Sequence, residues 1–132
     1  MRTVTVGRSQ RITFEEVARG ADGQAVSMLV AVEMTNLKGH RVVAAHYAKG
    51  FDDLSEFFGD LADHWTGWPG TKIYTSLEGD LQLTASHTGH VELGFTLQDP
   101  SFPETWSVRG QLTLDSGEEP THASEPMRSL LT

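Results

Sequence analysis

The spacing of apolar residues changes character once along this chain. Over residues 51–65 they recur at steps of three and four, whereas before and after this stretch they alternate with polar residues. Steps of three and four put side chains on one side of an α-helix, and alternation puts them on one side of a β-strand. The sequence therefore predicts one long amphipathic helix between two groups of strands. Asp53 and Glu56 have the spacing of a capping box at its start.

Alternating segments predict strands at residues 4–6, 12–14, 26–34, 41–47, 81–85, 91–97 and 106–114. Near the end, Ser124 is suited to cap a short helix that buries Met127, Leu130 and Leu131. We expect an α+β fold, with a mostly antiparallel sheet of about six strands. The long helix covers one face of that sheet, a short C-terminal helix follows, and residues 1–132 form a single domain.

The two strands on either side of Thr88-Gly89 predict a hairpin. A loop of residues 87–89 keeps the apolar residues of both strands on the same side of the sheet, pairing Ala85 with Val91 and Leu83 with Leu93. Gly89 then takes the left-handed conformation that such a loop requires.

The charge of the chain is concentrated in its second part. Residues 1–50 contain seven Lys/Arg and four Asp/Glu, whereas residues 51–132 contain three and fourteen, and the net charge is -8. An acidic surface repels nucleic-acid phosphates and attracts basic partners. We expect no nucleic-acid partner.

The chain has no cysteine and no apolar run of the ~20 residues needed to cross a bilayer. Its first residues alternate in polarity and do not resemble a secretory signal. We expect a cytoplasmic protein without a membrane partner.

An acidic row along the predicted helix is the first candidate site. Asp53, Glu56, Asp60 and Asp63 follow helical spacing and lie on one face. Such a row can dock a basic protein surface, although most acidic helix faces are simply solvated. The row favours a non-enzymatic interaction domain, of which an immunity protein that neutralises a basic toxin is one specific form.

A pocket between helix and sheet is the alternative, for a small-molecule binder or an enzyme. Its candidate residues are Trp68, Glu78, His90, Trp106 and Arg109. A homodimer formed through exposed strand edges is compatible with either hypothesis.

Catalytic and metal-binding signatures are missing from the sequence. It contains no G-x-S-x-G elbow and no phosphate-binding glycine loop. His87 and His90 lie at the predicted hairpin tip, where exposed histidines are a better interpretation than a zinc site. We therefore expect no metal, no cofactor and no catalytic residue.

Three local motifs in the second part of the chain carry a family resemblance. They are Trp65-x-x-Trp68-x-Gly70, then Ser76-Leu77-Glu78-Gly79-x-Leu81-x-Leu83, then His87-x-Gly89-His90-Val91-x-Leu93, and the matching region ends near Trp106. The chain resembles an uncharacterised family of small actinobacterial proteins, a domain of unknown function. The resemblance implies a bacterial cytoplasmic origin and supplies no catalytic residues.

Overall fold

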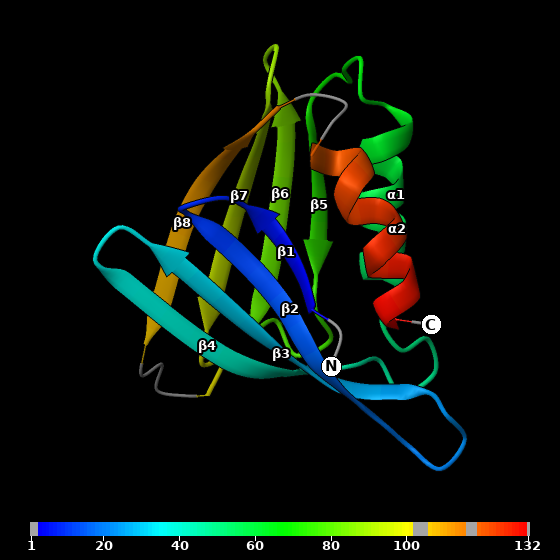
Figure 1. Ribbon diagram of the computed structural model, residues 1–132. Helices are drawn as coiled ribbons and strands as arrows, with labels where there is room; N and C mark the ends of the chain where they lie inside the picture. Colours follow the sequence, from blue (N-terminus) through cyan, green and yellow to red (C-terminus); the bar gives the residue numbers. More distant parts are fainter. Residues whose placement is uncertain (1–2, 102–105, 116–118, 132) are drawn as a thin grey trace.

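The computed structural model describes residues 3–101, 106–115 and 119–131, without the side chains of residues 119–122. Figure 1 shows its strands and helices in order along the chain. They are β1 (Thr3–Gly7), β2 (Arg11–Arg19), β3 (Ala25–Met34), β4 (Leu37–Ala44), α1 (Asp52–Asp63), β5 (Thr71–Thr75), β6 (Leu81–His87), β7 (Val91–Gln98), β8 (Ser107–Leu114) and α2 (Glu119–Leu131).

The strands form two four-stranded antiparallel sheets in which neighbours in sequence are neighbours in space. The orders are β1-β2-β3-β4 and β5-β6-β7-β8. The strands of the first sheet run obliquely across those of the second (Figure 1). Helices α1 and α2 pack on one another at one side of the sheets, where α1 contacts β5 and α2 contacts β1.

The predicted single sheet of about six strands under one long helix is therefore wrong. Alternation determines which side of a strand is buried, but not which strands share hydrogen bonds. Here α1 connects β4 to β5, and β4 and β5 belong to different sheets. Consecutive strands pair as hairpins within each sheet, and the apolar face of one sheet packs on the apolar face of the other.

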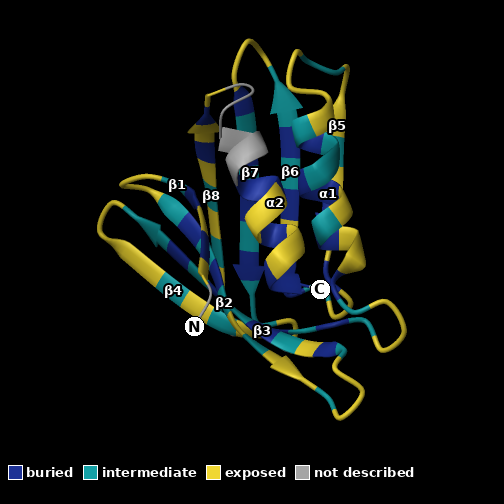
Figure 2. Ribbon diagram, turned by 45° about the vertical axis from the view of Figure 1, so that its right-hand side comes forward, coloured by how far each residue is buried: buried dark blue, intermediate teal, exposed yellow. Residues whose placement is uncertain are grey.

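The core lies between the sheets and beneath the helices. Buried and more exposed residues alternate along the strands, so each sheet turns one apolar face inward (Figure 2). Phe14 of β2 and Phe58 of α1 meet edge to face with ring centroids 5.9 Å apart. Each large side chain that is fully buried contributes about 1.5–3 kcal/mol of transfer free energy. The buried side chains of both sheets and both helices form one continuous cluster.

Helix α1 agrees with the apolar spacing but is shorter than predicted. Leu54, Phe57, Phe58 and Leu61 are buried, whereas the helix ends at Asp63 and Trp65 beyond it is half exposed. The predicted capping box is wrong, because the N-cap is Phe51 and no side chain caps the first turn.

Helix α2 buries Met127, Leu130 and Leu131, as predicted. Ser124 is not its cap. It lies inside the helix and is itself buried.

The β6–β7 hairpin has a register two residues away from the predicted one. His87 pairs with Val91, and Ala85 pairs with Leu93, so the loop is Thr88-Gly89-His90. A shift of two residues leaves the same side chains facing the core, and apolar alternation therefore cannot distinguish the two registers. Gly89 has the expected positive φ, 91°.

A buried ion pair connects the two sheets. Arg41 Nε of β4 donates to Asp80 Oδ2 at 2.9 Å, and the Asp80 side chain is fully buried. Ser76 Oγ donates to Asp80 Oδ1 at 2.7 Å and accepts a hydrogen bond from Leu81 N at 2.9 Å. The Ser-Leu-Glu-Gly segment thus forms the turn that holds this carboxylate in place.

Candidate functional site

A groove of about 550 Å³ runs between α1 and the edge strand β5. We call it the α1–β5 groove. Its lining residues are Asp53, Glu56, Phe57 and Asp60 from the helix, and Lys72, Ile73, Tyr74 and Thr75 from the strand. Asp53, Glu56 and Asp60 form an acidic wall on the α1 side of the groove, because their helical spacing places them on one face of α1 and β5 lies beside that face.

The charge of the groove comes mainly from Asp53 and Glu56. Lys72 Nζ lies 2.7 Å from Asp60 Oδ2, and His64 Nδ1 lies 2.9 Å from Asp60 Oδ1. The hydrogen bond from Lys72 lowers the pKa of Asp60 below its ordinary value of 3.8, although partial burial opposes this. Asp60 is thus neutralised locally, whereas Asp53 and Glu56 are exposed and make no hydrogen bond or ion pair with the residues that the structure describes.

Tyr74 lies in the same groove with most of its surface buried. The residue is 8 % exposed, and its ring centroid lies 6.3 Å from that of Phe57. Within the described part of the chain, its hydroxyl has no hydrogen-bond partner. Burial raises the pKa of Tyr74, and the negative charges of Asp53 and Asp80 add to the effect. The groove therefore contains a protonated phenol able to donate a hydrogen bond.

Strand β5 is an edge of its sheet. It pairs with β6 alone, and across residues 3–101, 106–115 and 119–131 its residues make no further backbone hydrogen bonds. Such an edge leaves N–H and C=O groups available for an added strand. The α1–β5 groove thus combines an acidic wall, two aromatic rings and an open strand edge.

The fourth acidic residue of the predicted row lies outside the groove. Asp63 is exposed at the last position of α1 and is not among the lining residues. The structure brings Asp53, Glu56 and Asp60 together in the groove and leaves Asp63 beside it.

The two tryptophans proposed for the alternative pocket lie at opposite ends of the second sheet. Trp68 Nε1 donates to Ala85 O at 3.3 Å, and Trp106 O accepts from Asp99 N at 3.1 Å. Trp68 therefore lies near Leu93, the partner of Ala85 on β7. Trp106 lies near Gln98, the residue before Asp99, which is five positions further along the same strand. Five positions along a strand span roughly 17 Å. The two indoles therefore do not face a common cavity.

The other three candidates of that pocket are also apart. Glu78 is exposed in the turn before β6, and His90 is exposed in the loop after it, at the opposite end of the strand. Arg109 is exposed on the outer face of β8. The structure does not bring these five residues together.

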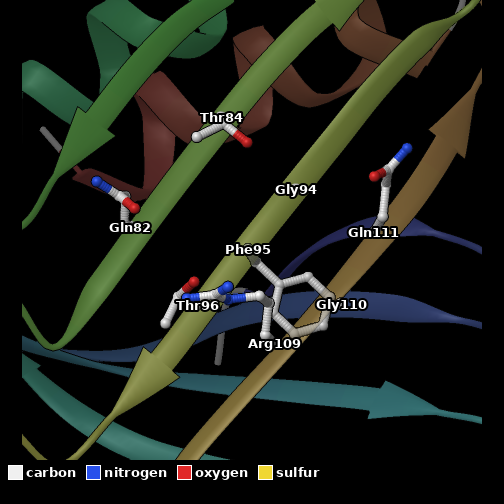
Figure 3. Close-up of a pocket in the computed structure, with 8 residues that line it drawn as sticks. All are labelled: Gln82, Thr84, Gly94, Phe95, Thr96, Arg109, Gly110 and Gln111. Carbon is white, nitrogen blue, oxygen red and sulfur yellow. The ribbon is translucent and has the colours of Figure 1, made fainter.

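Arg109 instead borders a polar hollow on the outer face of the second sheet, with a volume of about 550 Å³. Figure 3 shows bare backbone at Gly94, surrounded by side chains of β6, β7 and β8. The lining polar residues are Gln82, Thr84, Thr96, Arg109 and Gln111. We call this feature the Gly94 hollow. Of these residues, the sequence predicted only Arg109 as a candidate site residue. The pattern that points to this surface is the alternation of polar residues over 105–113, which predicts one polar face for that strand.

The two hairpin histidines do not belong to a larger group of candidate metal ligands among the described residues. His87 Nε2 lies 3.2 Å from Trp65 O, and His87 Nδ1 accepts from Gly89 N at 3.3 Å. His90 is exposed in the loop. In the part of the chain that the structure describes, no three residues of the types His, Cys, Asp and Glu gather where a metal ion could be held.

The fold and these surfaces define a class, a small acidic two-sheet domain with a charged groove and a polar hollow. None of the helices among the described residues has the length and apolarity to cross a bilayer. The chain belongs to the family described as "Family of unknown function (DUF6228)", whose model matches residues 3–132. No curated protein and no solved structure matches the chain.

Proposed function

We propose that this protein is a non-enzymatic interaction domain that binds a basic protein at the α1–β5 groove. The supporting observation is that Asp53 and Glu56 line a groove beside an open strand edge and are not neutralised by the described residues. Lysine and arginine side chains of a partner would supply the missing positive charges, and an extended segment would pair with β5. The immunity-type form of the proposal has a basic toxin as the partner.

Charge reversal of two residues tests the proposal. The tagged protein and its Asp53→Lys/Glu56→Lys variant are used to capture partners from the host's lysate at low and moderate salt. We expect the wild type to retain a basic protein more strongly at low salt, because salt screens exposed charges. The variant should lose that protein by roughly tenfold or more. Asp60 is left unchanged because its reversal would also break the contact with Lys72.

A matched control separates the groove from net charge. The Glu15→Lys/Glu78→Lys variant changes the net charge by the same amount at two positions that do not line the α1–β5 groove. It should retain the partner. Equal loss in both variants, or equal retention in both, would refute binding at the groove.

The origin and compartment form part of the same proposal. The tryptophan, Leu-Glu-Gly and histidine-glycine motifs support an actinobacterial origin. The absence of cysteine in the sequence supports a cytoplasmic location, where disulfides are rare.

A further inference from the structure

Gly94, which has no side chain, is one of the residues that line the Gly94 hollow. Gly94 lies on the outer face of β7, between Thr84 of β6 and Gln111 of β8. A Cβ atom at position 94 would lie 2.6 Å from Thr84 Oγ1, which is too close for two non-bonded atoms. The Thr84 hydroxyl therefore lies close over the backbone of Gly94, within a polar depression whose volume is in the range of small-ligand sites.

Arg109 supplies a positive charge to this hollow. It pairs across the sheet with Thr96, and Figure 3 shows its side chain reaching over β7 toward that residue. Of the three Lys/Arg in residues 51–132, Lys72 and Arg128 contact carboxylates. Arg109 has neither an ion pair nor a hydrogen bond to any residue that the structure describes. A guanidinium in this position is suited to bind a carboxylate or phosphate through two parallel hydrogen bonds.

Gln111 supplies an oriented acceptor two residues further along β8. Gln111 Nε2 donates to Glu92 Oε2 at 2.8 Å, and Thr113 Oγ1 donates to the same oxygen at 3.0 Å. Because a carboxylate only accepts, the amide nitrogen of Gln111 is directed to Glu92 and its Oε1 remains available. A ligand held by both Arg109 and Gln111 therefore carries a hydroxyl or N–H donor in addition to its anionic group.

We infer that the Gly94 hollow binds a small organic anion that also carries hydroxyl groups. Arg109 pairs with the anionic group, and Gln111 Oε1 accepts from a hydroxyl. Thr84 and Gln82 at the opposite border of the hollow offer a hydroxyl and an amide to the remaining polar atoms. The site lies on the second sheet's outer face, so it is separate from the α1–β5 groove. Its occupation does not depend on the proposed protein partner.

Titration of the full chain with D-gluconate and with glucose 6-phosphate tests this inference. Amide chemical shifts in ¹H–¹⁵N spectra locate binding, and calorimetry gives the affinity. We expect at least one of the two anions to move the signals of Gly94 and its neighbours. The one that binds more tightly identifies the anionic group as carboxylate or phosphate. D-glucitol, which lacks the charge, should bind at least tenfold more weakly.

Two variants keep the test decisive. Arg109→Gln should weaken binding by roughly tenfold or more, since one charged partner is lost. Lys38→Gln, which removes an exposed positive charge from the other sheet, should leave it unchanged. Both substitutions are at exposed positions, and unchanged spectra of the free variants establish that they fold. If neither anion binds at Gly94, or if Arg109→Gln binds as well as the wild type, the inference is overturned.

Discussion

Tyr74 places a phenol in a largely buried position where no described group accepts its proton. Burial and the charges of Asp53 and Asp80 disfavour the phenolate and raise the pKa of Tyr74 above its ordinary value of 10.0. The folded protein therefore holds this proton at a pH where the unfolded chain has released it. For such a group, the contribution to stability is complete below pH 10 and is lost as the pH rises.

The Tyr74→Phe variant tests this assignment. At neutral pH its free energy of unfolding should lie within about 1 kcal/mol of the wild type, because no hydrogen bond is lost. Between pH 10 and 11 the wild type should lose stability relative to the variant, by up to about 1.4 kcal/mol per pH unit. Urea unfolding at several pH values measures both curves. Curves that stay parallel above pH 10 would contradict a raised pKa.

At the scale of residues, the sequence predicted which side of an element a residue lies on better than which residues it contacts. The helical spacing of Asp53, Glu56 and Asp60 was sufficient to place them on one side of a helix. It could not predict that Lys72, twelve residues after Asp60, lies against that carboxylate, because the contact depends on how β5 packs beside α1. Trp68 and Trp106 are of a residue type that often lines pockets, yet their positions at opposite ends of the second sheet keep them apart.

At the scale of elements, β8 illustrates how a glycine accommodates an aromatic ring on the next strand. Phe95 of β7 pairs directly with Gly110 of β8. A Cβ atom at position 110 would lie 2.5 Å from Phe95 Cζ and 3.2 Å from Met34 Cε. The ring therefore occupies the space that a side chain at position 110 would need.

The Gly110→Ala variant should consequently be less stable than the wild type by about 1–3 kcal/mol, the usual cost of overpacking a core. Chemical denaturation measures the change. Gly39→Ala is the matched control, since its added Cβ meets Val108 Cγ2 at an ordinary 3.6 Å. Addition of Phe95→Leu should recover part of the stability of Gly110→Ala. A Gly110→Ala protein as stable as Gly39→Ala would show that the ring does not need this space.

Elements were predicted well where periodicity alone decides them, and poorly at their ends and pairings. The buried side of α1 followed from its apolar steps. The β6–β7 register did not, since the pairings Ala85–Val91 and Ala85–Leu93 bury the same side chains. The geometry of the loop and the lengths of the strands determine which of the two pairings forms.

At the scale of the whole molecule, two hairpin sheets are held together by a core, by α1 and α2, and by the Arg41–Asp80 ion pair. This division into two sheets was the main feature that the sequence did not predict. Alternation of polar and apolar residues along the strands shows which side of each strand is buried. It is the same for one curved sheet as for two sheets that face one another. The arrangement places the edge strand β5 beside the acidic face of α1, so the proposed binding groove is a consequence of the fold as well as of the charges.

Site-specific photo-crosslinking in the host tests most directly that the α1–β5 groove is the binding surface. The photoreactive p-benzoylphenylalanine replaces Ile73, which lines the groove and is 62 % exposed, or Val42 of the edge strand β4, which is 61 % exposed. The two positions match in exposure and strand context and differ in their distance from α1. We predict a covalent adduct with a basic protein from position 73 and none from position 42. An adduct from position 42 alone, or none from either position, would contradict binding at the groove.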